Sequence, residues 1–415
     1  MKFLISLAFK NLTRYKRRTI ITASAIAFGL MMYIFIDSML MGAEYESVRN
    51  LKWYETASAR ILNEEYWENR FQKPLDLSIP EPDKILAKLE QNNIAATKRI
   101  SFSGDLILNK EDFGEEGNLP VSVFAIDTEK DFDVFQFGDT LQSGRFLEPG
   151  EDAVVMGSWM AEDIGAEVGY WITIVARGNG GFYEAMDLEV VGILNCPNPN
   201  VNRTLVMMPF ETANDYLAMD GAATEINIKL SDNADVDEEV NNIQAMLNGD
   251  DLTVMSWEAM AKDFLALAEA KRGGSGMILF LIFIIAAVGI SNTMLMAIFE
   301  RIRELGMMRS LGMADRNIRI AFMIEAAGIG FVGSLIGIVL GIGATYFIVE
   351  KGIDFTFMMR DMDMGYRIQG LFRGEWNPMT MIKAFFAGIL ISSLVAYFPT
   401  KRALKMDIPS CLRHQ

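Results

Sequence analysis

The stretch ERIRELGMMRSLGMADRNIRIAFMIEAAGIGFVGSLIGIVLG, from Glu300 to Gly341, joins a short charged segment to a long apolar run. The apolar run, 320–349, carries a single charged residue, Glu325. As a helix it is long enough to cross a hydrocarbon layer about 30 Å thick. Five arginines lie in the charged segment before it. The stretch therefore predicts a membrane-spanning helix with a basic segment at one end.

Three further apolar runs predict membrane-spanning helices. Residues 19–36 and 277–299 carry no charge, and 384–398 reaches full length if the residues from Met379 are included. The alternative for the first run is a cleaved signal peptide. Its A-x-A pattern begins at Ala23, near the start of the run, where cleavage would leave most of the apolar core in place. Four spans are therefore assigned, to 19–41, 276–299, 322–349 and 380–399.

Lysine and arginine are concentrated beside the spans on one side. They cluster in 1–18, 300–321 and 400–415, whereas most acidic residues behind the net charge of −16 lie elsewhere. Because short cytoplasmic segments are enriched in Lys and Arg, both termini and 300–321 are predicted to be cytoplasmic. In a bacterial inner membrane, 42–275 is then one large periplasmic domain and 350–379 a short outer loop. The first segment, 1–18, is predicted to be an amphipathic cytoplasmic helix.

The large domain between the first two spans alternates short β-rich runs with amphipathic helices, which predicts an α+β fold. Strands are expected at 121–127, 170–177, 188–194 and 225–230, and helices at 80–91, 236–247 and 257–267. Two turn-rich stretches, 178–181 and 198–202, are predicted to be exposed loop tips. They either connect neighbouring elements or contact cargo or a soluble partner.

The composition excludes several classes of function. The chain has two cysteines, Cys196 and Cys411, predicted on opposite sides of the membrane, and one histidine, His414. This argues against a disulfide framework, a metal site and a His-based triad. The glycine-rich stretch 273–276 lacks the lysine of a phosphate-binding loop, and no basic, aromatic-rich groove for nucleic acid is evident. The chain is expected to be non-catalytic, with its energy supplied by a partner or an ion gradient.

Ionisable residues inside the predicted spans are few. Glu325 lies one to two turns into the third span and Asp37 lies near the outer end of the first. Such residues are costly in lipid and usually functional. Glu325 is interpreted as an anchor for the cytoplasmic end, with a proton carrier as the alternative, and Asp37 is paired with Lys383. The expected partners of Glu325 are Arg14, Arg17 and Arg402.

Glycines recur at four-residue spacing in the third span, at Gly333, Gly337 and Gly341. Two overlapping GxxxG patterns allow another helix backbone to approach closely. They predict a tight helix interface, and an ordinary glycine-rich span is the alternative.

The stretch from Glu300 resembles the MacB/LolCDE/FtsX superfamily of ABC transporter permeases, in which a charged helix between the second and third spans contacts the ATPase. LVAYFPTKRALKMDIPSCLR, from Leu394, is similar to the closing motif of the family. GRFLEPGEDAVVMGSWMAEDIGAEVGYWITIV, from Gly144, is similar to a segment of its outer domain. By this resemblance Glu325 matches the glutamate that enters the third span. The residues implied for the coupling helix are Glu300, Arg301, Arg303, Glu304, Gly306, Arg309 and Gly312.

The resemblance implies two permeases, a copy or a paralogue of each other, around a pair of cytoplasmic ATPases. ATP and magnesium would be bound by the ATPases, and hydrolysis would move the outer domains by mechanotransmission. The pattern is most similar to the LolC/LolE type, which extracts lipoproteins from the membrane lipids for a periplasmic carrier. The first and second spans would then grip the acyl chains. The alternatives are a MacB-like efflux permease with an adaptor and an FtsX-like regulator of a cell-wall hydrolase.

Overall fold

The computed structural model describes residues 16–108, 117–231, 234–247, 251–354, 371–406 and Cys411. The predicted amphipathic helix over 1–18 lies almost entirely outside these ranges. The chain divides into two compact units, which are described separately. Among the described residues, the helical unit takes those up to Tyr45 and those from Ala266 onward, and the sheet unit takes those of Glu46–Leu265.

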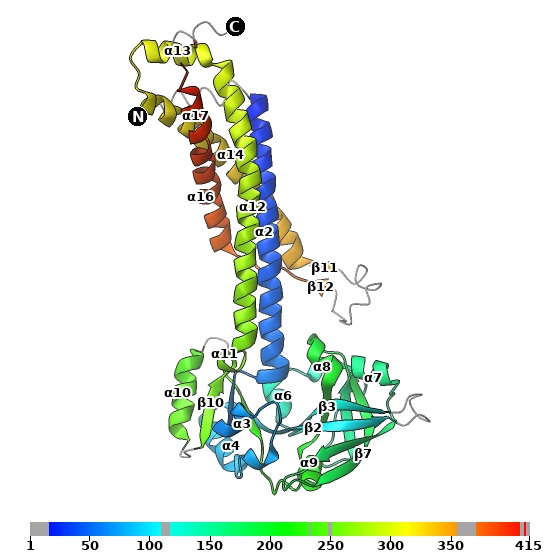
Figure 1. The fold of residues 1–415 in the computed structure, drawn as a ribbon. Helices are drawn as coiled ribbons and strands as arrows, with labels where there is room; N and C mark the ends of the chain where they lie inside the picture. Colours follow the sequence, from blue (N-terminus) through cyan, green and yellow to red (C-terminus); the bar gives the residue numbers. More distant parts are fainter. Residues whose placement is uncertain are drawn as a thin grey trace. The chain divides into compact units, whose positions relative to one another are not determined.

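The helical unit contains four helices that are long and apolar enough to cross a membrane, as the sequence predicted. The structure has α2 (Lys16–Leu51), α12 (Lys262–Glu300), α14 (Asp315–Glu350) and α16 (Pro378–Val395) (Figure 1). Two shorter helices, α13 (Ile302–Ser310) and α17 (Tyr397–Ala403), follow α12 and α16. Both α2 and α12 extend beyond the apolar runs, because a helix continues wherever its backbone hydrogen bonds are kept, in lipid or in water.

The glycines of α14 form the contact with α2. A Cβ atom built on Gly333 would lie 2.9 Å from the carbonyl oxygen of Ala23, and one on Gly337 would lie 2.9 Å from that of Ala27. Gly341 continues the same row against α2. Any side chain would therefore force the two backbones apart, so these glycines set the distance between the helices.

Small residues also join α14 to α16. A Cβ atom on Gly330 would lie 2.7 Å from Cβ of Ser392, whose hydroxyl donates to the carbonyl oxygen of Gly388 at 2.6 Å. Ser334, fully buried, faces Gly388 from the other helix. One face of α14 thus packs against α2, and another face packs against α16.

The sheet unit is built on one mixed sheet of ten strands (Figure 1). The strand order is β10-β1-β9-β2-β3-β8-β5-β7-β4, with β6 paired to β2 and β7. The pairs β3–β8 and β5–β7 are parallel and the other pairs are antiparallel. The strands are β1 (Ala59–Asn63), β2 (Ala95–Leu108), β3 (Gly117–Ile126), β4 (Leu141–Gly144), β5 (Ala153–Gly157), β6 (Trp171–Arg177), β7 (Tyr183–Leu194), β8 (Leu205–Pro209), β9 (Glu225–Lys229) and β10 (Leu252–Ser256).

Short helices cover the sheet and divide its interior into separate cores. One core lies where α4 (Pro82–Gln91) and α10 (Val236–Met246) cover β1, β9 and β10, and it contains Ile61, Ile226 and Ile243. Another lies under α7 (Ser158–Ile164) and α9 (Phe210–Leu217). The remaining short elements are η1 (Lys52–Thr56), α3 (Glu64–Glu68), η2 (Leu75–Leu77), α6 (Asp131–Val134), η3 (Gly138–Thr140), α8 (Pro199–Thr204) and α11 (Trp257–Met260), with β11 (Ile353–Asp354) and β12 (Leu371–Phe372) in the helical unit.

A buried ion pair fixes β2 to α6. Arg99 donates from Nε and Nη2 to the two carboxylate oxygens of Asp131, each at 2.7 Å, and both side chains are almost completely inaccessible. The guanidinium also lies 3.4 Å from the centroid of the Phe135 ring. Because either partner alone would be an uncompensated buried charge, the pair holds the register between these two elements.

The four predicted strands are confirmed as β3, β6, β7 and β9, and two of the predicted helices as α4 and α10. The predicted helix over 257–267 is wrong in its extent, because α11 ends at Met260 and Lys262 begins α12. The turn over 178–181 is confirmed between β6 and β7, where Gly180 and Gly181 have φ of +93° and +90°.

The prediction of an exposed loop tip over 198–202 is wrong. Asn198 caps α8 by accepting a hydrogen bond from the backbone N–H of Asn200 at 3.0 Å. The side chain of Asn202 is fully buried, donating to the carbonyl oxygen of Cys196 at 2.7 Å and accepting from its N–H at 2.9 Å. The asparagines that suggested a turn instead satisfy buried backbone groups.

The glycine row predicts a matched pair of substitutions in α14. Gly337→Ile should lower the stability of the helical unit by about 1–3 kcal/mol, because the added side chain overlaps Ala27 and Leu30. Gly343→Ile is the control, since a Cβ atom there meets nothing within 4 Å. Thermal unfolding in detergent should give a lower midpoint for the first variant, and equal midpoints would contradict the proposed packing.

Candidate functional site

The charged segment between the second and third spans folds as α13, packed at the end of α12 and α14 (Figure 1). Its apolar side, with Ile302 and Leu305, is buried against Ile318 and Phe322 of α14 and Leu404 of the chain's last described segment. Gly312, with φ of +87°, allows the chain to reverse after α13. Thus α13 is a helix held firmly against the span that follows it.

The seven residues predicted for the coupling helix do not share one role. Arg303 is exposed and Glu304 is half-buried, so both can meet a partner. Glu300 is the exposed last residue of α12. Arg301 and Gly306 are buried, so they pack α13 against its neighbours and lie away from its outer surface. That the seven residues together form a coupling helix stays a prediction.

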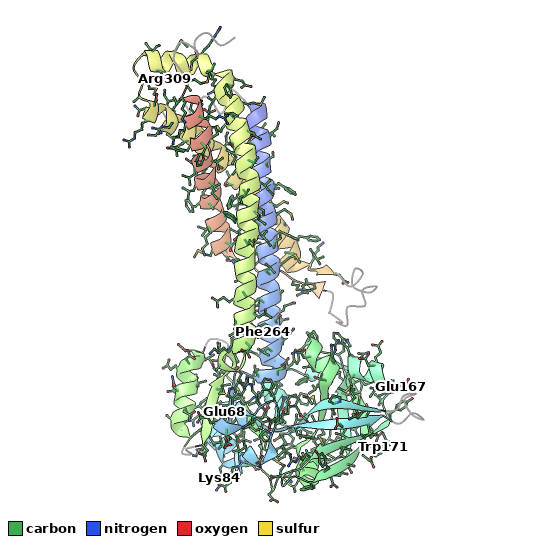
Figure 2. All side chains as sticks on the ribbon, viewed as in Figure 1. Glu68, Lys84, Glu167, Trp171, Phe264 and Arg309 are labelled. Atoms are coloured by element: carbon green, nitrogen blue, oxygen red, sulfur yellow. The ribbon has the colours of Figure 1, made fainter. Side chains whose placement is uncertain are left out.

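Arg309, labelled in Figure 2, also makes contacts with other parts of the same chain. Its Nη1 donates to the carbonyl oxygen of Met406 at 2.6 Å, and its Nε lies 3.2 Å from Asp315 Oδ1. The residue therefore links α13 both to the start of α14 and to the segment after α17.

An apolar groove runs along α13 and α14. It has a volume of about 460 Å³. Leu311 is 86% exposed at this site and Met307 is 53% exposed. Arg301, Glu304 and Glu325 supply its charged groups, and its other lining residues are Met308, Met313, Ile318, Ala321 and Phe322. Apolar side chains that stay exposed beside charged ones are typical of surfaces that bind another protein.

Glu325 is a buried carboxylate in α14, and its ion-pair partner is Arg301, which the sequence analysis did not name. Arg301 Nη1 lies 3.4 Å from Glu325 Oε2, and both side chains are less than 5% exposed. The expected partners Arg14 and Arg17 have no described side chain, and Arg402 is exposed. The ion pair ties the first residue after α12 to the interior of α14. That Glu325 anchors the cytoplasmic end of the span stays a prediction.

Asp37, which follows the apolar run inside α2, accepts a hydrogen bond from Asn377 Nδ2 at 3.0 Å. In the described part of the chain no ion pair within 4 Å joins Asp37 to Lys383, so the predicted pair is not seen there. In the described ranges, no group of three or more His, Cys, Asp or Glu side chains could hold a metal ion.

A second apolar groove, also of about 460 Å³, lies between α2 and α12. Its two threonines are hydrogen-bonded: Thr22 Oγ1 donates to Thr293 Oγ1 at 3.2 Å, and Thr293 Oγ1 donates to the carbonyl oxygen of Gly289 at 2.8 Å. Gly29 packs closely on Ile282 at one point along it, whereas Gly289 leaves room, since a Cβ atom there would meet nothing within 4 Å. The remaining lining residues are Ile21, Ala25, Phe28, Met32, Ile36, Ile282, Ile285 and Ile290. The groove can accept an extended apolar chain and offers almost nothing to a polar ligand.

The sequence analysis missed the apolar half of the α13 site. The methionines and Leu311 lie within a segment that was interpreted through its charges and glycines alone. The available signal was the helical spacing of Met307, Met308 and Leu311, which places them along one side of a charged helix.

Two family models match the chain and together cover most of it. The MacB-like periplasmic core domain matches residues 19–246, and the FtsX-like permease C-terminal model matches residues 276–408. The first match includes α2 and most of the sheet unit. The second includes α13, the groove beside it and the last three spans.

Curated relatives agree with these matches. The chain is 27% identical to the lipoprotein-releasing system transmembrane protein LolC of Neisseria meningitidis, over 68% of this chain and 70% of that protein. It is 23% identical to the macrolide export ATP-binding/permease protein MacB of Escherichia coli, over 97% of this chain and 59% of that protein. An uncharacterized ABC transporter permease of Methanocaldococcus jannaschii is 21% identical to it, over 99% of this chain and 97% of that protein. The chain therefore belongs to the MacB/LolC/FtsX superfamily of ABC transporter permeases.

Proposed function

We propose that this permease is driven by a separate cytoplasmic ATPase subunit that docks on α13. The groove beside α13 supports this, because it combines exposed apolar side chains with Glu304, and Arg303 is exposed on the same helix. The concentration of basic residues in the same segment favours a cytoplasmic position, with both termini on that side and the sheet unit in the periplasm. The subunit would act as one of a pair, with ATP and magnesium bound by the ATPases.

The cargo that the site supports best is a lipid-anchored protein. The groove between α2 and α12 is apolar and lies within the spans, so it suits an acyl chain. The relative LolC belongs to a lipoprotein-releasing system. In this proposal, ATP-driven movement of α13 changes the packing of the spans, the acyl chains leave the groove, and a periplasmic carrier receives the lipoprotein.

A second candidate function is efflux of an apolar compound, with the sheet unit contacting an adaptor. It is favoured by the MacB relative, whose match extends over 97% of this chain. In both cases the ATPase docks on α13, so only the cargo assay separates the two functions. An FtsX-like regulator of a cell-wall hydrolase would leave the groove between α2 and α12 without a use.

A charge placed in the α13 groove should block docking of the ATPase. Leu311→Glu puts a carboxylate at the centre of the exposed apolar patch and should weaken the complex about tenfold or more, since central apolar contacts dominate such interfaces. The measurement is co-purification of the ATPase and ATP hydrolysis in nanodiscs.

Asn317→Glu is the control for this substitution. It adds the same charge to an exposed residue of the first turns of α14 that does not line the groove. Equal ATPase binding by the two variants would exclude the groove as the docking surface.

Filling the groove between α2 and α12 should reduce lipoprotein release. A Cβ atom on Gly289 meets nothing within 4 Å, so Gly289→Phe can place its ring in the groove without a backbone clash. Excluding two methylene groups of an acyl chain costs about 1.6 kcal/mol, roughly tenfold in affinity. The measurement is transfer of lipoprotein from proteoliposomes to a soluble carrier.

The matched control is Gly343→Phe, which adds the same ring at an equally open glycine of α14, away from the groove. Release that stays normal in both variants, together with impaired export of an apolar compound by Gly289→Phe alone, would favour efflux over lipoprotein extraction.

A further inference from the structure

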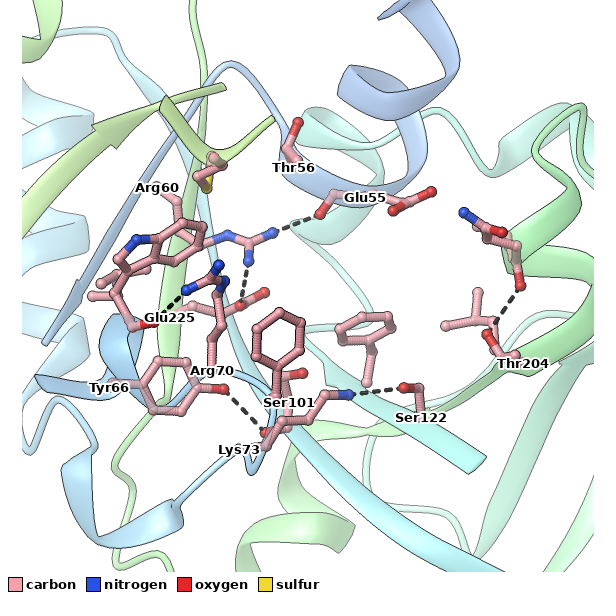
Figure 3. Close-up of a pocket in the computed structure, with 18 residues that line it drawn as sticks. Glu55, Thr56, Arg60, Tyr66, Arg70, Lys73, Ser101, Ser122, Thr204 and Glu225 are labelled. Atoms are coloured by element: carbon pink, nitrogen blue, oxygen red, sulfur yellow. Dashed lines mark hydrogen bonds and ion pairs between the residues drawn. The ribbon is translucent and has the colours of Figure 1, made fainter. Parts of the chain in front are cut away.

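The sheet unit contains a pocket of about 350 Å³ that the transport function does not use (Figure 3). Its walls come from segments far apart in the sequence: η1, β1, α3 and the residues that follow it, β2, β3, α8 and β9. Its ionisable lining residues are Glu55, Arg60, Tyr66, Arg70, Lys73 and Glu225. Three of these are cationic and two are carboxylates, so the pocket carries an excess of one positive charge.

Both carboxylates already have partners. Glu225, almost completely buried, lies 2.9 Å from Arg60 Nη1 and accepts a hydrogen bond from Asn227 Nδ2 at 3.0 Å. Glu55 accepts a hydrogen bond from Asn198 Nδ2. Arg60 is thereby neutralised, and the unbalanced charge belongs to Arg70 and Lys73.

Lys73 is held by neutral groups. Its Nζ donates to Ser122 Oγ at 2.9 Å and to the carbonyl oxygen of Phe102 at 3.4 Å, and lies 5.1 Å from the centroid of the Phe124 ring. Because an ammonium group has three N–H donors, one remains for a ligand. Lys73 also has φ of +48°, a left-handed conformation that costs a non-glycine residue about 1 kcal/mol.

Arg70 lies beside it, supported by aromatic rings. Its guanidinium carbon is 4.4 Å from the centroid of Trp67 and 4.6 Å from that of Phe71, and Nη1 donates to the carbonyl oxygen of Trp67 at 3.1 Å. Within the part of the chain that the structure describes, neither Arg70 nor Lys73 has a carboxylate within 4 Å. Aromatic faces stabilise a cation while leaving most of its donors available.

We propose that this pocket binds the carboxylate of an organic anion with an apolar, ring-sized body. Lys73 and Arg70 would donate to the carboxylate, and Trp67, Phe71 and Phe124 would pack on the body. A single negative charge matches the excess charge of the pocket, and its volume lies in the range of small-molecule sites. The carboxylate belongs either to a free organic acid or to the C-terminus of a peptide.

The affinity should depend on pH. Burial of the Lys73 ammonium lowers its pKa to about 8. The negative charge of Glu225 on β9 raises this pKa, and the positive charge of Arg60 on β1 lowers it. The carboxylate of the ligand stays ionised above neutral pH, so binding should weaken as the pH rises beyond about 8 and Lys73 loses its proton. The other ionisable groups that line the pocket are Glu55, Tyr66 and Arg70.

The test uses the full chain in nanodiscs and calorimetric titration at pH 7. The probes are 3-phenylpropionate, its uncharged amide, and an acetylated tripeptide that ends in phenylalanine with a free or an amidated C-terminus. The carboxylates should bind saturably and the amides should not. Tighter binding of the free-acid peptide than of 3-phenylpropionate assigns the site to a chain terminus, and equal binding assigns it to small organic acids.

Lys73→Met should weaken carboxylate binding roughly tenfold or more, because it removes the charge and keeps the length of the side chain. The control is Lys84→Met, which removes an exposed lysine of α4 (Figure 2). Arg70→Gln, a change nearer the surface, keeps the test valid if Lys73→Met does not fold. Equal binding of acids and amides, no binding of any probe, or unchanged binding by both variants would overturn the proposal.

Discussion

The close approach of α2 and α14 is the contact on which the helical unit depends. Lipid is as apolar as the helices, so burial of apolar surface provides little force for association there, and tight backbone packing has to provide it. Gly333, Gly337 and Gly341 allow this packing and fix one face of α2. Toward α12 the contact at Gly29 is also close, because a Cβ atom there would lie 2.8 Å from Ile282. Space remains beside this contact, and the acyl-sized groove is that space.

Polar contacts concentrate at the ends of the helices. At the α13 end, the ion pair of Arg301 and Glu325 and the contacts of Arg309 with Asp315 and Met406 join three segments. A force applied to α13 therefore acts on α14 directly and on the segment after α17. Because α14 also carries the glycine row, a displacement of α13 would change the α2 contact. This provides a physical route from an ATPase to the spans in the mechanism that we propose.

Much of the fold could be predicted from the sequence, for reasons that particular residues make clear. Uncharged runs such as 277–299 are long enough to predict a membrane-spanning helix without any knowledge of tertiary contacts. Strands β6 and β7 alternate buried and exposed residues. The loop prediction over 198–202 failed because Asn202 satisfies the backbone of Cys196, a contact that composition does not reveal. The helix over 257–267 was misjudged because α12 begins in a polar segment, before its apolar run.

The sites were harder to predict than the fold. The charges and glycines of 300–312 marked α13, but which of them face inward depends on packing against α14 and on Leu404. The pocket around Lys73 has no local signal at all. Its residues lie between Glu55 and Met260, and they meet only because β9 pairs with both β1 and β2. Lys73 lies in a turn between α3 and η2, and the sequence around it does not indicate a binding site. Its role depends on its contacts with Ser122 and Phe124, which only the fold brings beside it.

The two cysteines have a practical consequence. Cys196 and Cys411 are both buried, and burial raises the pKa of the Cys196 thiol to about 12. The thiolate is the form that attacks alkylating and spin-labelling reagents, so Cys196 is protected from them by both inaccessibility and protonation. A cysteine introduced on the surface would therefore react with these reagents faster than Cys196 or Cys411, and the two natural cysteines need not be replaced. Paired labels on α13 and on the sheet unit could then report how far each moves during nucleotide turnover.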